Sequence, residues 1–162
     1  CRYMAKAGRV FVCGTGSSGL AAREMELRFM RIGLDITSMD HSDMIRMRGV
    51  FQDENCLVFG VSISGEKEEV LYLLEEAHKR GARTVMLTAR NRPDFDAFCD
   101  EVMLLPSLLH LNHGNVISPQ FPILLLTDIL YSYYLSQDPY KKEVLHDSTL
   151  RALEKGRREN VM

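Results

Sequence analysis

The chain has 162 residues, which is long enough for one domain with a sizeable hydrophobic core. Its 46% hydrophobic and 26% charged residues are ordinary for a folded globular protein, and its formal net charge of −2 gives no basis for binding nucleic acid or an anionic membrane through this segment. The longest apolar run, residues 121–126, is too short to cross a bilayer.

Apolar periodicity predicts strands and helices that alternate along the chain. We expect strands at residues 10–13, 35–39, 56–61, 83–87 and 101–105 and helices at residues 1–7, 18–31, 43–48, 66–80, 123–135 and 147–159. The run 56–61 is apolar without alternation, which is typical of a central parallel strand buried on both faces. The alternation predicts the α/β class, with a five-stranded parallel sheet in a three-layer α/β/α sandwich.

Two loops rich in glycine and serine each follow a predicted strand and precede a predicted helix. The first is Gly14-Thr15-Gly16-Ser17-Ser18-Gly19, and the second is Ser62-Ile63-Ser64-Gly65. A helix N-terminus offers free N–H groups and a positive dipole end, and ligands of parallel sheets bind beyond the carboxyl ends of the strands. We therefore expect both loops to serve one pocket that holds a phosphate group.

Two alternative interpretations of these loops remain open at this stage. Gly14, Gly16 and Gly19 match the G-x-G-x-x-G fingerprint of a dinucleotide site, with Asp40 placed where a ribose-binding carboxylate is expected. That interpretation leaves the second loop unexplained. The other alternative is that Ser18 and Ser64 are ordinary helix caps, although neither is followed by the Glu or Gln of a capping box.

The pattern G-x-G-x-S-G followed by S-x-S-G-x-x-x-E, each opening a helix, resembles a sugar isomerase (SIS) domain. The closer resemblance is to the effector domain of RpiR/MurR-type bacterial transcription regulators. It covers nearly the whole chain, so residues 1–162 are expected to form a single SIS domain. Supporting segments are Met30-Arg31-Ile32-Gly33, the Asp40-x-x-Asp43 pair and the helix containing residues 126–131.

The resemblance implies a flavodoxin-like sheet, a sugar-phosphate effector and a homodimer or higher oligomer. It also implies a DNA-binding helix-turn-helix domain N-terminal to this segment, and a chain that opens on Cys1 is expected to be part of a longer protein. Matched by motif, the phosphosugar-binding residues would be Gly16, Ser17, Ser18, Ser62, Ser64, Gly65, Lys67 and His113. Two departures are Lys67, where the family usually has threonine, and Gln120, where an arginine is frequent.

The resulting hypothesis is a sensor that binds a sugar phosphate without cofactor and controls DNA binding by another domain, and is not an enzyme. The alternative is an aldose or ketose phosphate isomerase, which needs a base beside the reacting carbon atoms. His113 and Glu101 are the default candidates for that base. The histidines His41, His110 and His113 lack a completing ligand set, so no metal site is expected.

The four cysteines, Cys1, Cys13, Cys56 and Cys99, show no C-x-x-C spacing. Cys13 and Cys56 lie inside apolar strand-like runs. We expect buried thiols in the reducing cytoplasm rather than a disulfide framework.

Overall fold

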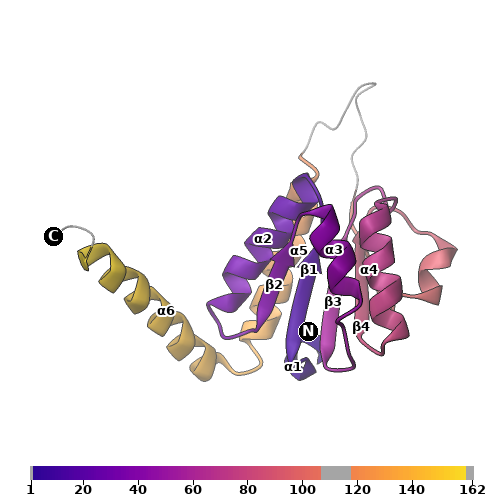
Figure 1. Ribbon diagram of the computed structural model, residues 1–162. Helices are drawn as coiled ribbons and strands as arrows, with labels where there is room; N and C mark the ends of the chain where they lie inside the picture. The colour runs from indigo at the N-terminus through magenta and orange to yellow at the C-terminus, as the bar shows by residue number, and fades with distance from the viewer. Residues whose placement is uncertain (1, 107–117, 160–162) are drawn as a thin grey trace.

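A five-stranded parallel sheet forms the centre of the computed structural model, which describes residues 2–106 and 118–159 (Figure 1). The strands are β1 (Arg9–Cys13), β2 (Ile36–Met39), β3 (Cys56–Val61), β4 (Arg83–Thr88) and β5 (Glu101–Leu104). They are hydrogen-bonded in the order β2-β1-β3-β4-β5. The predicted α/β class and five-stranded parallel sheet are confirmed.

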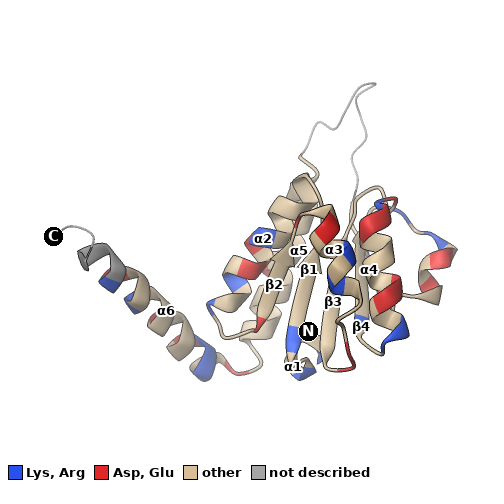
Figure 2. Ribbon diagram, in the orientation of Figure 1, with Lys and Arg blue, Asp and Glu red and all other residues tan. Residues whose placement is uncertain are grey.

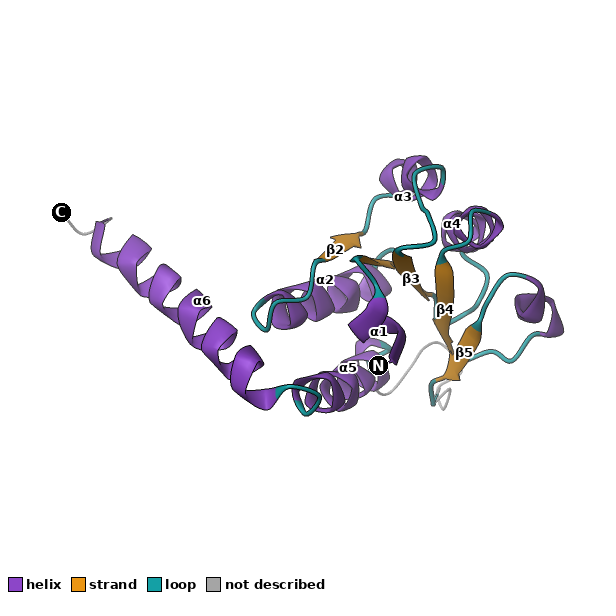
Figure 3. Cartoon of the chain, turned by 90° about the horizontal axis from the view of Figure 1, so that it is seen from below, coloured by secondary structure: helices purple, strands orange, loops and turns teal. Residues whose placement is uncertain are grey.

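Helices cover both faces of the sheet (Figure 3). The helices α1 (Arg2–Lys6), α2 (Ser17–Met30) and α5 (Gln120–Leu135) lie on one face, and α3 (Ser42–Gly49) and α4 (Glu68–Lys79) lie on the other. A short 3-10 helix, η1 (Pro93–Ala97), connects β4 to β5. The last helix, α6 (Pro139–Glu159), extends away from the sandwich (Figure 1).

The central strand β3 is buried on both faces of the sheet, which explains why its sequence is apolar without alternation. All six of its residues are buried. Leu57 and Phe59 pack in the core cluster under α2 and α5, whereas Val58 packs in the cluster under α4. Gly60 lets α4 approach, because a Cβ atom there would lie 2.6 Å from Leu74 Cδ1.

The helices α2 and α5 are joined by aromatic and charged contacts. The Phe29 ring lies 5.5 Å from that of Tyr131, centroid to centroid, in an edge-on arrangement. Arg28 forms an ion pair with Asp128 and stacks 4.7 Å from the Tyr131 centroid. The carboxylate of Asp128, an isolated charge inside an apolar helix sequence, is therefore satisfied by a helix of its own chain.

The prediction that the last helix begins at residue 147 is wrong, since α6 begins at Pro139. Asp138 caps the helix by accepting the Lys141 N–H at 3.3 Å. Proline in a first helical turn loses no hydrogen bond that the helix could make. Lys142 is buried at the junction, where its Nζ donates to the Tyr134 carbonyl and lies 3.8 Å from the Tyr134 ring centroid.

The carboxylate of Asp100 stabilises the connection between β4 and β5 through hydrogen bonds. Asp100 accepts hydrogen bonds from the Thr84 N–H at 2.8 Å and from the Arg83 guanidinium. Burial alone would raise the pKa of Asp100, but these hydrogen bonds and the Arg83 charge outweigh burial and lower the pKa below its usual range. The ionised form is therefore stabilised in the folded state.

This balance predicts how stability depends on pH. Because the pKa of Asp100 is lower folded than unfolded, its contribution is complete above the unfolded pKa, about 4, and is lost as the pH falls through the folded value. The Asp100→Asn variant should lose about 1–2 kcal/mol of unfolding free energy at pH 7. Its unfolding free energy, measured by urea titration at several pH values, should also fall less steeply as the pH decreases. Asp147→Asn, which changes an exposed residue, is the control. It should have the same unfolding free energy as the original protein, with the same dependence on pH.

Three cysteines, Cys13, Cys56 and Cys99, are free and buried, as predicted. Cys1 lies outside the described residues. Within the described ranges, no helix combines the length and the apolar character needed to cross a membrane.

Candidate functional site

The two Gly/Ser loops leave neighbouring strands at the middle of the sheet. β1 and β3 are hydrogen-bonded partners, with Cys13 in register with Gly60. The chain proceeds from β1 to β2 on one side and from β3 to β4 and β5 on the other, so the strand order reverses between β1 and β3. Open parallel sheets bind ligands beyond the carboxyl ends of their strands at such a reversal.

The first loop connects β1 to α2, and backbone N–H groups at the start of this helix are without a capping side chain. Gly16 is the N-cap residue, with φ at +58°, and no side chain caps the helix. The first turn of an α-helix has no internal acceptor for its N–H groups, which here include those of Ser17 and Ser18. Ser18 is buried and Ser17 is exposed. Ser18 does not act as the helix cap, because it lies within α2, after the N-cap residue Gly16, and makes no capping bond.

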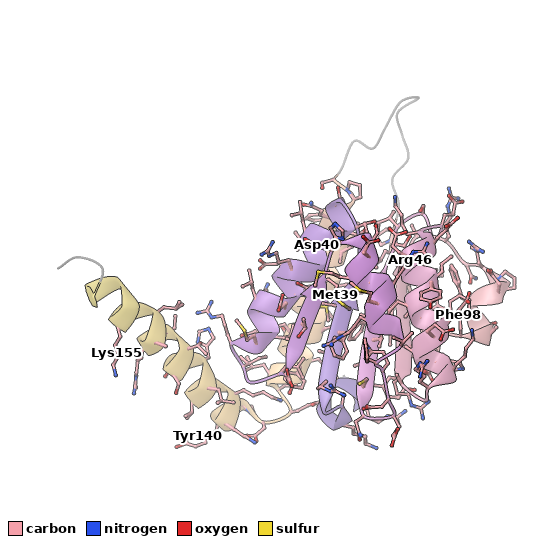
Figure 4. The ribbon with its side chains drawn as sticks, in the orientation of Figure 1. Met39, Asp40, Arg46, Phe98, Tyr140 and Lys155 are labelled. Atoms are coloured by element: carbon pink, nitrogen blue, oxygen red, sulfur yellow. The ribbon has the colours of Figure 1, made fainter. Side chains whose placement is uncertain are left out.

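Close backbone packing shapes this loop. A Cβ atom on Gly19 would lie 2.7 Å from the Gly14 carbonyl oxygen and 2.8 Å from Asp40 Cβ. The Gly14 N–H donates to the Met39 carbonyl at 3.1 Å, which extends the β1–β2 ladder into the loop. Asp40 lies at the same end of the sheet as the start of α2 (Figure 4).

The second loop connects β3 to α4 and contains a buried hydroxyl without a partner. Ser62 is 1% exposed, and its Oγ makes no hydrogen bond. The Ser62 N–H donates to the Leu87 carbonyl, and its own carbonyl accepts the Gly65 N–H, both at 3.0 Å. Ser64 is exposed and accepts the Glu66 N–H at 3.3 Å. The backbone of this loop is therefore fixed while the Ser62 hydroxyl remains unpaired.

A second unpaired hydroxyl lies on the first loop. Thr15 Oγ1 is buried and makes no hydrogen bond. Buried polar groups without partners are uncommon in native proteins and cost roughly 1–3 kcal/mol each. Thr15 and Ser62 thus give each loop one hydroxyl that a bound polar group could satisfy. The sequence interpretation assigned no role to Thr15, although its place between two loop glycines was visible.

Residues at the end of β4 and just after it support the second loop from its other side. Thr88 is buried and its Oγ1 donates to the Ile63 carbonyl at 3.4 Å. Arg92 Nη1 donates to the Gly65 carbonyl at 2.8 Å, and its guanidinium lies 5.1 Å from the Phe95 centroid. The ion pair with Asp94 raises the pKa of Arg92, so it stays charged. The sequence predictions did not include these residues. The signal that could have found them is that they are polar and follow a predicted strand, which places them at the same edge of the sheet as the two loops.

Charges of both signs surround the second loop (Figure 2). Lys67 is the exposed N-cap residue of α4 and has no side-chain capping bond. Arg90 is exposed and lies beside Gly65, since a Cβ on that glycine would lie 3.4 Å from Arg90 Cβ. Glu66 and Glu68 are also exposed, and Glu68 pairs with Arg46 at 3.5 Å. An anion at this edge would therefore meet two cationic side chains beside the carboxylates.

The described residues offer little for covalent or acid–base chemistry at this edge. Burial raises the pKa of the Cys13 thiol, so this cysteine beneath the first loop remains protonated and unreactive. Glu101 is the first residue of β5 and so lies at the amino end of its strand, opposite the loops. Glu101 is therefore wrong as a candidate base. The described ranges contain no cluster of three His, Cys, Asp or Glu side chains that could hold a metal ion.

The sequence also points to four further residues. His113 and His110 lie outside the described residues. His41 is the exposed N-cap residue of α3 and makes no side-chain capping bond. Gln120 begins α5 and lines a groove of about 330 Å³ between α5 and α2.

Together, the reversal of strand order and the two polar loops define an α/β sandwich domain whose polar edge carries two uncapped helix N-termini. The family model described as the SIS domain matches residues 3–126. The chain belongs to the SIS domain family.

Curated relatives include regulators and an isomerase. An HTH-type transcriptional regulator of Haemophilus influenzae is 27% identical over 131 residues, covering 81% of this chain and 46% of the relative. The 3-hexulose-6-phosphate isomerase of Mycobacterium gastri is 29% identical over 130 residues, covering 80% of this chain and 63% of the enzyme. The chain spans about half the length of the regulators that it matches.

Solved structures share the fold. The Vibrio vulnificus NanR protein, complexed with ManNAc-6P, superposes with a TM-score of 0.83 and 24% identity, covering 95% of this chain and 58% of that one. The sugar isomerase domain of an RpiR transcription factor from Sphaerobacter thermophilus gives a TM-score of 0.81 and 18% identity, covering 93% and 82%. These likenesses establish the flavodoxin-like arrangement of the SIS fold.

Proposed function

We propose that this SIS domain is the sugar-phosphate-sensing part of a bacterial RpiR-type transcriptional regulator. In this proposal the phosphosugar binds between the two serine loops, and its occupancy controls DNA binding by an N-terminal helix-turn-helix domain of a longer cytoplasmic protein. The proposal also includes a homodimer, through which occupancy of the site reaches the DNA-binding domains.

The observation that carries the proposal is the buried, unpaired hydroxyl of Ser62, which follows β3, the strand paired with the one that leads into the uncapped first turn of α2. Phosphate oxygens accept hydrogen bonds from hydroxyls and from helix N–H groups, so a phosphate would satisfy both. Ser17, Ser18 and Ser64 add further hydroxyls, and Lys67 and Arg90 add positive charge. Gly16 and Gly65 contribute positive φ angles that shape the two loops. His113 stays a proposed contact to the sugar.

Several similarities support a sensor over an enzyme. Regulators of Haemophilus influenzae and Clostridium perfringens match this chain at 27% and 28% identity, and the NanR neighbour was solved with a sugar phosphate. An isomerase remains the second candidate because the Mycobacterium gastri enzyme is equally similar. The described part of the site supplies no buried carboxylate or histidine that could act as the base of an isomerase.

Incubation with sugar phosphates separates these two functions. The protein is mixed with a panel of hexose and pentose phosphates, and NMR spectra follow both the sugars and the protein. We expect protein shifts and a raised melting temperature with one or a few sugars, without conversion of the sugar. Turnover at about 1 s⁻¹ or faster, which is typical of enzymes, would contradict the sensor.

Arg92 should affect binding indirectly, by holding the second loop. Replacing Arg92 by methionine removes the hydrogen bond to the Gly65 carbonyl, which is worth roughly 1 kcal/mol. We expect the affinity for the sugar phosphate, measured by calorimetry, to fall about fivefold. Arg80→Met, at the far end of α4, is the matched control and should bind as the original protein does. An unchanged affinity for Arg92→Met would mean that this contact does not shape the site.

A further inference from the structure

Lys142 is a buried amine at the junction of α5 and α6 (Figure 1). It is 7% exposed, and no other charged side chain of the described ranges is buried. Its Nζ donates to the Tyr134 carbonyl in the last turn of α5 and lies 3.8 Å from the Tyr134 ring centroid. The ammonium group of Lys142 therefore joins the end of one helix to the start of the next.

The position of Lys142 within α6 is unfavourable for a positive charge. Because α6 begins at Pro139, Lys141 and Lys142 lie at its N-terminal end, where the first turn contains no acidic residue. The N-terminus of a helix is the positive end of its dipole, which destabilises a cation there. The carbonyl and the ring of Tyr134 offset this cost while the two helices stay in contact. The charge of Lys142 and the contact between α5 and α6 thus depend on each other.

A pocket of about 280 Å³ gives access to Lys142. It lies between the α5–α6 junction and the residues Ile32 and Gly33 that follow α2. The charged residues of its lining are Asp138, Lys141 and Lys142, and Lys141 is exposed. The pocket thus has room for a small group on the Lys142 nitrogen, and the Lys141 ammonium would attract a reagent that carries negative charge.

The surroundings of Lys142 also favour the neutral form of its amine. Burial is the largest cause and lowers the pKa of the ammonium, the Asp138 carboxylate opposes this shift, and the Lys141 charge adds to it. Tyr134 is the remaining titratable residue of the pocket lining, and the lining residues from α1 and from the turn after α2 are uncharged. A lysine whose pKa is lowered holds more of its amine in the neutral, nucleophilic form at a given pH.

We propose that Lys142 is an acylation site for acyl phosphates and that its acylation releases the start of α6 from α5. The neutral amine attacks the carbonyl carbon of the acyl phosphate, and a C–N bond forms. The C–O bond to phosphorus-bound oxygen breaks, inorganic phosphate leaves, and the nitrogen loses a proton to water. The acylated side chain is uncharged, so the attraction of a cation to the Tyr134 carbonyl and ring is lost.

The first part of the test measures acylation in the full chain with acetyl phosphate as the reagent. Mass spectrometry of peptides gives the rate of acetylation at Lys142 and at Lys155, an exposed lysine of the same helix. We expect Lys142 to react at least about threefold faster than Lys155 near neutral pH, because more of its amine is neutral. The ratio of the two rates should decrease as the pH rises towards about 10, where the exposed amine also becomes neutral.

The second part measures the contact between the helices by hydrogen exchange. Peptides from the start of α6 that carry the acetyl group on Lys142 are compared with the unmodified peptides, and Lys142→Gln provides an uncharged variant that needs no reagent. We expect amides 143–148 to exchange at least about tenfold faster in the acetylated protein and in Lys142→Gln than in the original chain. Lys155→Gln is the matched control and should exchange as the original chain does, and thermal unfolding checks that both variants fold.

Two results would overturn the proposal. If Lys142 is acetylated no faster than Lys155, then the buried amine is not an acylation site. If amides 143–148 keep their protection after acetylation of Lys142, then the charge of this residue does not hold α6 to α5. The acetylated protein gives this second result even if Lys142→Gln fails to fold.

Discussion

Replacing Ser62 by alanine is expected to weaken sugar-phosphate binding by about 10- to 100-fold, while the unfolding free energy of the unliganded protein stays the same or rises. A hydrogen bond to a charged group is worth roughly 1.5–3 kcal/mol, which accounts for the loss of affinity. Stability behaves differently because the Ser62 hydroxyl is buried and unpaired in the unliganded protein. Removing it also removes a desolvation penalty.

Ser38→Ala provides the matched contrast. Ser38 lies in strand β2, and its hydroxyl, unlike that of Ser62, has a partner, since it donates to Glu26. Its removal should lower the unfolding free energy by about 1 kcal/mol and leave ligand affinity unchanged. Calorimetry measures the affinities, and urea unfolding measures the stabilities. If Ser62→Ala loses stability and keeps its affinity, then Ser62 is a structural residue and the site is wrongly assigned.

Replacing Gly19 by alanine is expected to cost about 1–3 kcal/mol of stability and to abolish sugar-phosphate binding in the fraction that folds. The new methyl group would lie 2.7 Å from the Gly14 carbonyl oxygen and 2.8 Å from Asp40 Cβ. The carbonyl is backbone, so the strain is relieved only if α2 moves away from the end of β1. That movement displaces the helix N-terminus from the phosphate.

Gly8→Ala is the control for this variant. A Cβ on Gly8 would meet Asn55 at 3.7 Å, an ordinary contact, so its stability and binding should match those of the original protein. Thermal unfolding and calorimetry with the same sugar phosphate compare the two variants. Normal binding by a stable Gly19→Ala protein would show that the close packing of the first loop is not needed for the site.

Local sequence patterns were sufficient to predict the central parallel sheet and the position of the two serine loops. The unbroken apolar run at residues 56–61 predicted a strand buried on both faces, and the structure confirms it. The position of both serine loops at one edge followed from parallel strands alone. These features depend on composition and period, which are properties of short segments.

Other features depend on contacts between distant segments and could not be predicted. The hydrogen bond from Arg92 to the Gly65 carbonyl joins the segment after β4 to the loop after β3, two segments that are 27 residues apart in the sequence. The burial of Ser62 and the lack of a partner for its hydroxyl depend on the tertiary structure around the loop. The start of α6 was missed because residues 139–146 lack a clear apolar period, whereas Asp138 and the buried Lys142 fix that turn through local and tertiary bonds.

The most direct test of the phosphate site is an amide NMR titration of the full chain with inorganic phosphate and with sugar phosphates. The site predicts that the largest shifts fall on residues 15–19 and 62–67, and that the Ser62→Ala variant loses them. Shifts confined to other parts of the sheet, or the same shifts in the variant, would contradict a phosphate held between the two loops.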